Sequence, residues 1–92
     1  MADEFKKIKN RKKELKRVNW NIVKRLVTLL YHDEKIKRTN IAMKCGLRYD
    51  SCLRYLDWLD TMDLIKREFD QDGFELINLT KKGRNLYTKK LR

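Results

Sequence analysis

Residues 38–61 read RTNIAMKCGLRYDSCLRYLDWLDT, and the fold can be predicted from this segment outward. Its first part predicts a short helix from about Arg38 to Cys45, and Gly46 follows where a helix commonly ends in a left-handed residue. A longer helix is expected over residues 49–61, since its apolar side chains recur at three- and four-residue steps. These inward positions are Cys52, Tyr55, Leu56 and Leu59. Two helices joined by such a tight turn are typical of a helix-turn-helix.

Residues 19–31, which precede this pair, predict a third amphipathic helix. Its apolar residues at helical spacing are Ile22, Val23, Leu26, Val27, Leu29 and Leu30. Asn19 is the expected N-cap, because its side chain can accept a hydrogen bond from a free backbone N–H at the start of the helix. Residues 32–35 are then a polar break before the next helix.

The residues after the pair predict two short strands and a last helix. Leu64–Phe69 and Phe74–Leu79 are apolar and aromatic, and DQDG at residues 70–73 between them predicts the turn of a β-hairpin. Thr80 is the expected cap of a helix over residues 81–91. The apolar side of that helix carries Gly83, Leu86, Tyr87 and Leu91.

The order of these elements predicts an α+β domain over residues 18–92, a winged helix-turn-helix with a three-helix core, a β-hairpin wing and a C-terminal helix. Residues 1–17 are a separate basic segment, with eight Lys or Arg residues against three acids. Phe5, Ile8 and Leu15 in this segment have heptad-like spacing. The pattern fits either a helix that docks a thin apolar seam or a disordered basic arm.

The segment Ile36–Tyr87 resembles the small archaeal winged-helix DNA-binding proteins and transcriptional regulators. The matching motifs are CGLRY at residues 45–49, Cys52 with Tyr55, Leu56 and Leu59, Leu64 with Ile65, and LTKKG at residues 79–83. The last of these motifs, a Leu-Thr-x-x-Gly after a hairpin, is the most specific. Asp63 stands where these proteins usually have Gly, and the C-terminal helix is shorter than the coiled-coil helix of some relatives. The resemblance implies a DNA-binding function.

Composition and motifs exclude several other classes of protein. No apolar run approaches the roughly 20 residues that span a bilayer, and the first residues do not resemble a signal peptide, so we expect a cytoplasmic, nucleoid-associated protein without a membrane partner. Cys45 and Cys52 match no common metal spacing and are expected in the core; we expect neither a metal nor a cofactor. No phosphate-binding glycine loop or nucleophile motif is present, and we therefore predict that the protein is not an enzyme.

The charge is strongly positive and unevenly distributed. A net charge of +11 favours polyanions, with nucleic acid first among them. Residues 35–48 hold five bases and no acid, and residues 80–92 hold six bases and no acid. Residues 49–79 reverse the sign, with three bases against eight acids. A nucleic-acid face must therefore be built from the two basic blocks and residues 1–17.

The helix over residues 49–61 is expected to lie in the major groove of double-stranded DNA, with its N-terminal, outward side chains at base edges. The base-reading candidates are Arg48, Tyr49, Asp50, Ser51 and Arg54. An arginine can bind guanine through two hydrogen bonds, and Asp50 can accept one from cytosine N4. Alternatively, Asp50 forms an ion pair with Arg54 four residues later on the helix.

A second set of basic residues is expected to contact phosphates and so to position the domain without reading sequence. These candidates are Lys37, Arg38, Lys44, Lys66, Arg67, Lys12 and Lys13. The tip of the wing is acidic, because it carries Glu68, Asp70, Asp72 and Glu75. We therefore do not expect the tip to enter the minor groove.

Two other binding functions are alternatives on the sequence alone. A protein-interaction module within a larger complex would offer its acidic helix over residues 49–61 and its acidic wing to a basic partner. RNA binding is the other alternative, although the chain lacks the exposed aromatic strands of an RNA-recognition sheet. Apolar residues that the core need not fully absorb are Trp20, Leu53, Trp58, Phe74 and Leu76. They are either partly buried or part of a homodimer or partner surface.

Overall fold

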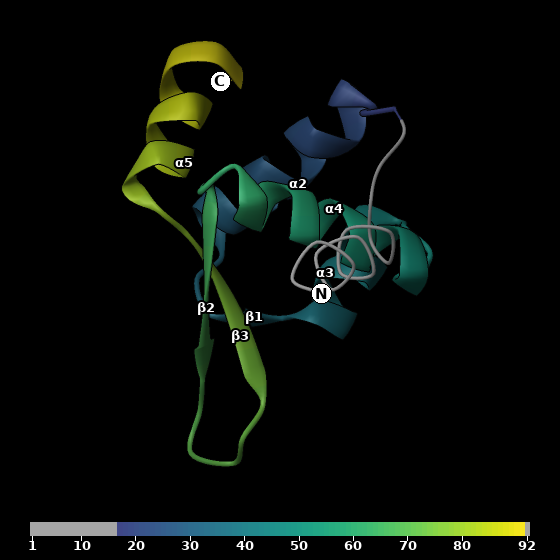
Figure 1. Ribbon diagram of the computed structural model, residues 1–92, viewed down its shortest axis with the longest axis vertical. Coiled ribbons are helices and arrows are strands. Elements are labelled where there is room, and N and C mark those ends of the chain that lie inside the picture. Colours follow the sequence, from purple (N-terminus) through teal and green to yellow (C-terminus); the bar gives the residue numbers. More distant parts are fainter. Residues whose placement is uncertain (1–16, 92) are drawn as a thin grey trace, which may run out of the picture.

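A computed structural model describes residues 17–91 of the chain. The elements in order are α2 (Trp20–His32), β1 (Ile36–Lys37), α3 (Arg38–Cys45), α4 (Tyr49–Thr61), β2 (Ile65–Phe69), β3 (Glu75–Leu79), α5 (Lys81–Leu86) and the π-helical turn η1 (Tyr87–Leu91). Figure 1 shows the β2–β3 hairpin projecting from the helices, with α5 beyond the opposite end of the sheet. The predicted winged-helix architecture is confirmed, whereas the predicted basic segment lies almost entirely outside the described residues.

Local hydrogen bonds explain where α2 and α3 begin and end. The Asn19 side chain accepts a hydrogen bond from the Asn21 N–H at 2.9 Å, which confirms Asn19 as the N-cap of α2. The Asn19 N–H in turn donates to the Tyr55 hydroxyl of α4 at 3.0 Å. Gly46 ends α3 at φ 67°, where a glycine avoids the steric cost of a Cβ. The Arg25 guanidinium donates to the carbonyl of Cys45 at 2.8 Å and so satisfies one free acceptor at the end of α3.

A single hydrophobic core joins the three helices α2, α3 and α4 to the sheet. Its buried members from the helices are Val23, Leu26, Val27, Leu30, Ile41, Ala42, Cys45, Cys52, Tyr55, Leu56 and Leu59. The strands and the residues before them add Ile36, Leu64, Ile65, Ile77 and Leu79. All four inward positions predicted for α4 are buried, so one face of that helix is committed to the core and the other is left to solvent. No helix in the described part of the chain is long and apolar enough to cross a membrane.

The sheet has one strand more than the sequence predicts. Its strand order is β1-β3-β2, and both pairings are antiparallel. The missed strand, β1, pairs Ile36 with Ile77 and Lys37 with Leu76. A strand of two residues is too short to show alternation, and its position depends on a distant contact: the Lys35 N–H donates to the side chain of buried Asn78 at 2.7 Å. The preceding polar break thus leads directly into the sheet.

The last helical segment also differs from the expectation in its second half. Thr80 caps α5 as predicted, because its hydroxyl accepts a hydrogen bond from the Gly83 N–H at 3.1 Å. The predicted α-helix over residues 81–91 changes to π-helical geometry at Tyr87. Tyr87 stacks on Tyr31 of α2 with ring centroids 4.2 Å apart. This contact holds the C-terminal segment against α2.

Candidate nucleic-acid interface

The N-terminal half of α4 presents the predicted base-reading residues on its outward side. The Arg48 side chain is 87% exposed, and Tyr49 is 42% exposed. Asp50 and Arg54 are also exposed, and Ser51 is half-buried. Because the opposite side of α4 is anchored in the core, these five residues lie together on the surface that follows the tight turn. The arrangement suits insertion of the helix into a groove.

Two arginines on this surface differ in their surroundings. The Nε atom of Arg48 lies 3.8 Å from Oδ1 of Asp50, and that same oxygen accepts a hydrogen bond from the Ser51 N–H at 2.9 Å. The alternative Asp50–Arg54 pair is not formed, and Arg54 makes no ion pair with any residue between 17 and 91. An exposed ion pair as long as that of Arg48 is weak. Both guanidinium groups can therefore exchange their present surroundings for a base edge.

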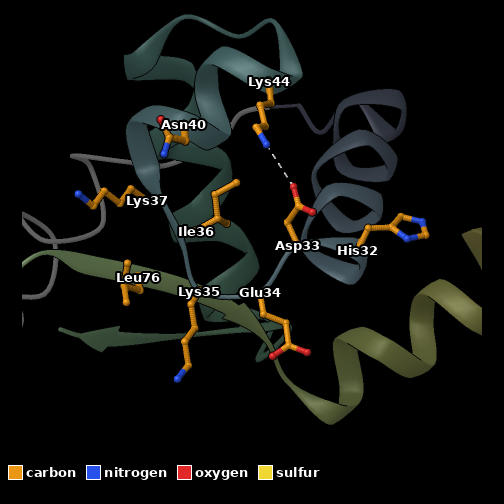
Figure 2. A pocket seen from close by; sticks show the side chains of 9 residues that line it. All are labelled: His32, Asp33, Glu34, Lys35, Ile36, Lys37, Asn40, Lys44 and Leu76. Atoms are coloured by element: carbon orange, nitrogen blue, oxygen red, sulfur yellow. Dashed lines mark hydrogen bonds and ion pairs between the residues drawn. The ribbon is translucent and has the colours of Figure 1, made fainter.

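The three phosphate candidates at the start and end of α3 each have a partner within the chain. Lys37 Nζ lies 4.0 Å from the centroid of the Phe74 ring, and Arg38 Nε lies 3.2 Å from Oε1 of Glu75. Lys44 Nζ lies 3.3 Å from Oδ2 of Asp33 and donates a hydrogen bond to it, as Figure 2 shows. A phosphate must compete with these partners. The competition is easiest at Lys44, whose side chain is 54% exposed.

A shallow groove of about 510 Å³ lies between the end of α2, β1 and α3. Ile36 and Leu76 contribute apolar surface, and the rim carries three lysines and two acids: Lys35, Lys37, Lys44, Asp33 and Glu34. In Figure 2 the Lys35 and Lys37 side chains extend away from each other, and only Lys44 points toward an acid of the rim. The groove is thus a mixed-charge edge of the basic block 35–48. No group of three or more His, Cys, Asp or Glu side chains that could hold a metal ion occurs within residues 17–91.

Arg67 is the phosphate candidate that the structure places elsewhere. Its Nη2 donates to Asp57 of α4 at 2.8 Å, its Nε lies 3.6 Å from Asp60, and its Nη1 lies 3.8 Å from Glu75 of β3. The Arg67 side chain is only 25% exposed. Its guanidinium therefore joins the wing to α4 through three carboxylates, and a phosphate would have to compete with all of them. The sequence signal that was missed is the pair of acids, Asp57 and Asp60, three residues apart on one side of α4.

We expect Arg67→Ala to destabilise the domain by about 1–3 kcal/mol, less than a fully buried pair because the cluster is partly open to solvent. The substitution leaves three carboxylates near one another without their shared cation. Lys66→Ala on the same strand is the matched control, since the Lys66 side chain is 58% exposed and lies 3.8 Å from Glu68. Its effect should stay within about 0.5 kcal/mol. Urea denaturation of the full chain measures both values, and equal stabilities would show that the cluster does not hold the wing.

The remaining candidates divide between the wing and the undescribed N-terminal segment. Lys66 is exposed at the base of the wing and is available for a backbone contact. Lys12 and Lys13 lie outside the described residues.

Cys45 and Cys52 are buried, as predicted. Burial raises the pKa of the Cys52 thiol to about 11, with a smaller contribution from nearby Cys45, so Cys52 stays a protonated core thiol at neutral pH.

Comparisons with solved structures show the same fold in longer proteins. MepR, a transcription regulator of the Staphylococcus aureus multidrug efflux pump MepA, superposes with a TM-score of 0.71 at 23% identity and covers 74% of this chain and 52% of its own. A MarR-family transcriptional regulator from Silicibacter pomeroyi superposes with a TM-score of 0.69 at 22% identity, and the match covers 74% of this chain and 47% of the regulator. The transcriptional repressor CouR, solved on a 23-mer DNA duplex, superposes with a TM-score of 0.68 at 24% identity. The match covers 72% of this chain and 48% of CouR.

The chain thus spans about half the length of each of these solved proteins. No curated protein sequence matches it. The family model described as winged helix-turn-helix matches residues 16–92, which include all the described helices and strands. On this match and on its own architecture, the chain belongs to the winged helix-turn-helix family.

Proposed function

We propose that the protein binds double-stranded DNA as a transcriptional regulator or chromatin-associated protein, with α4 in the major groove. The observation that carries this proposal is the exposed N-terminal half of α4, where Arg48 and Arg54 lie opposite the buried face. Helices presented in this way place their N-terminal side chains at base edges. Support also comes from the basic block 35–48 beside the helix and from CouR, a repressor of the same fold solved on duplex DNA.

The basic residues divide into those that read bases and those that contact the DNA backbone in this proposal. Arg48 and Arg54 read bases, and Tyr49, Asp50 and Ser51 complete the surface around them. Lys37, Arg38 and Lys44 contact phosphates after exchanging their partners within the chain, and Lys66 contacts the backbone from the base of the wing. Lys12 and Lys13 add phosphate contacts from the N-terminal segment. Arg67 has no role in DNA binding here, because the acids of α4 and β3 hold it.

A homodimer would present two α4 helices to half-sites about 34–36 Å apart, one helical turn of DNA. We also propose that the protein is associated with the nucleoid and is related to archaeal winged-helix regulators. The stoichiometry on duplexes that carry one or two sites separates a monomer from a dimer.

A salt titration with duplex DNA tests the proposed function. If about five phosphates are neutralised, the logarithm of the association constant should fall with the logarithm of salt concentration with a slope of about −4.5. Single-stranded DNA and RNA of equal length serve as controls and should bind more weakly. A slope near zero, or no duplex binding at low salt, would contradict DNA binding. A preference for RNA would favour the RNA alternative.

A further inference from the structure

The tip of the wing, residues 68–75, combines exposed aromatic rings with acidic side chains. Its sequence is EFDQDGFE, with four acids and no base. Phe69 is 70% exposed and Phe74 is 52% exposed, and both belong to the hairpin that projects away from the helices (Figure 1). Two exposed phenylalanines on one projecting hairpin make this tip a candidate binding surface. The DNA-binding function proposed above does not use this surface.

Hydrogen bonds in the turn hold the tip in a defined shape. Oδ1 of Asp70 accepts from the Asp72 N–H and from the Phe74 N–H, each at 2.9 Å, and the Asp70 N–H donates to the Phe74 carbonyl at 3.0 Å. Phe69 pairs across the hairpin with Glu75, whose carboxylate belongs to the Arg38 and Arg67 cluster. The tip is therefore braced against α3 and α4. A preorganised surface loses little entropy when it binds a partner.

A contact within the chain shows that a ring of the wing tip binds a cation. Lys37 of β1 places its ammonium 4.0 Å from the centroid of the Phe74 ring, in a cation–π contact. Phe69 has no such cation over its ring within residues 17–91. Asp70 and Asp72, the acids of the turn that follows Phe69, would further attract a positive side chain to this end of the hairpin. Phe69 is thus an uncovered counterpart of the lysine-covered Phe74.

Charge decides between the kinds of partner that an exposed ring can bind. A phenylalanine on a wing could wedge between base pairs, but the four acids of the tip would then approach the phosphates. A basic protein segment removes that conflict, because its lysines or arginines complement the acids and stack on the ring. The outer edge of β2 offers backbone groups to such a segment, since β2 is an edge strand of the sheet within residues 17–91.

We propose that the wing tip is a docking surface for a lysine- or arginine-rich segment of a partner protein, with the Phe69 ring receiving one cationic side chain and the acids of the tip its neighbours. The wing tip shares no residue with the outward side of α4. The proposal does not depend on DNA binding.

Hexalysine is the probe, titrated into the ¹⁵N-labelled full chain and followed by amide chemical shifts. The titration is done at about 0.15 M salt, where the Debye length of about 8 Å screens the positive charge on the rest of the domain. Shifts are expected at the amides of residues 66–75. Phe69→Leu, which keeps an apolar side chain but removes the aromatic face, should weaken binding about two- to fivefold. The double variant Glu68→Gln with Asp72→Asn should also weaken it.

Two controls make this result specific. Phe69→Tyr keeps an aromatic face and should bind hexalysine as the unmodified chain does. Asp63→Asn removes an exposed acid that precedes β2, at the end of the strand opposite to the tip, and it should leave binding unchanged. The proposal is wrong if saturating hexalysine shifts amides outside residues 66–75 and leaves those within this range unchanged, or if it shifts no amide at all. It is equally wrong if Phe69→Leu binds hexalysine as tightly as the unmodified chain. It is also wrong if Phe69→Leu lowers the affinity for duplex DNA, because Phe69 would then be a DNA wedge.

Discussion

Gly83→Ala is expected to lower the free energy of unfolding by about 3 kcal/mol, the upper part of the usual range for overpacking. A Cβ atom at residue 83 would overlap the carbonyl oxygen of Leu64 and lie 2.9 Å from Cδ2 of Leu79. The Leu64 carbonyl cannot move freely, because it also accepts a hydrogen bond from the Thr80 N–H at 3.0 Å. The overlap is thus with fixed backbone at the point where α5 meets the sheet.

Helix propensity acts in the opposite direction and makes the sign of this result informative. Gly83 lies inside α5, where alanine alone would stabilise a helix by about 1 kcal/mol relative to glycine. The matched control is Gly73→Ala in the turn of the wing, where φ is +86° and no atom lies within 4 Å of the added Cβ. That variant should lose only about 1–2 kcal/mol from backbone strain. Urea denaturation of both variants measures the difference, and a Gly83→Ala protein as stable as the unmodified chain would refute the close approach.

Arg48→Ala and Arg54→Ala are expected to differ from Lys44→Ala in the kind of binding defect. A bidentate arginine–guanine contact provides about 1–3 kcal/mol of discrimination against the wrong base, so at least one arginine variant should lose preference at a defined base pair. Lys44 is placed at the end of α3 beside Asp33 and contacts no base in this proposal. Its removal should weaken all duplexes about equally and reduce the magnitude of the salt slope by about 0.9.

Binding-site selection on the unmodified chain and the three variants separates these effects. Asp50→Asn is a useful fourth variant, because it removes the carboxylate that lies 3.8 Å from Arg48 and keeps every basic residue of the protein. It should raise the affinity for all duplexes by lowering repulsion from phosphate, and it should lose any preference for cytosine that Asp50 provides. The same sequence preference in all proteins would show that α4 does not read bases. The protein would then coat DNA without specificity or bind a protein partner.

Local sequence patterns predict the helices, the hairpin and the buried face of α4. Periodic apolar residues such as Leu56 and Leu59 predicted the buried side of α4, because the helical repeat alone decides which side chains share a face. Local hydrogen bonds and turn chemistry likewise predicted the caps at Asn19 and Thr80 and the turn at residues 70–73. Each of these features depends on residues within a few positions of one another.

The partners of the basic residues depend instead on contacts between distant parts of the chain. Arg67 looked free on its strand, but packing brings it to Asp57, ten positions earlier, and to Glu75 on the neighbouring strand. Lys37 meets the Phe74 ring, and β1 forms only because its two residues find β3. The energy of an ion pair or a short strand depends on partners that are close in space and distant in sequence, and no local period reports them.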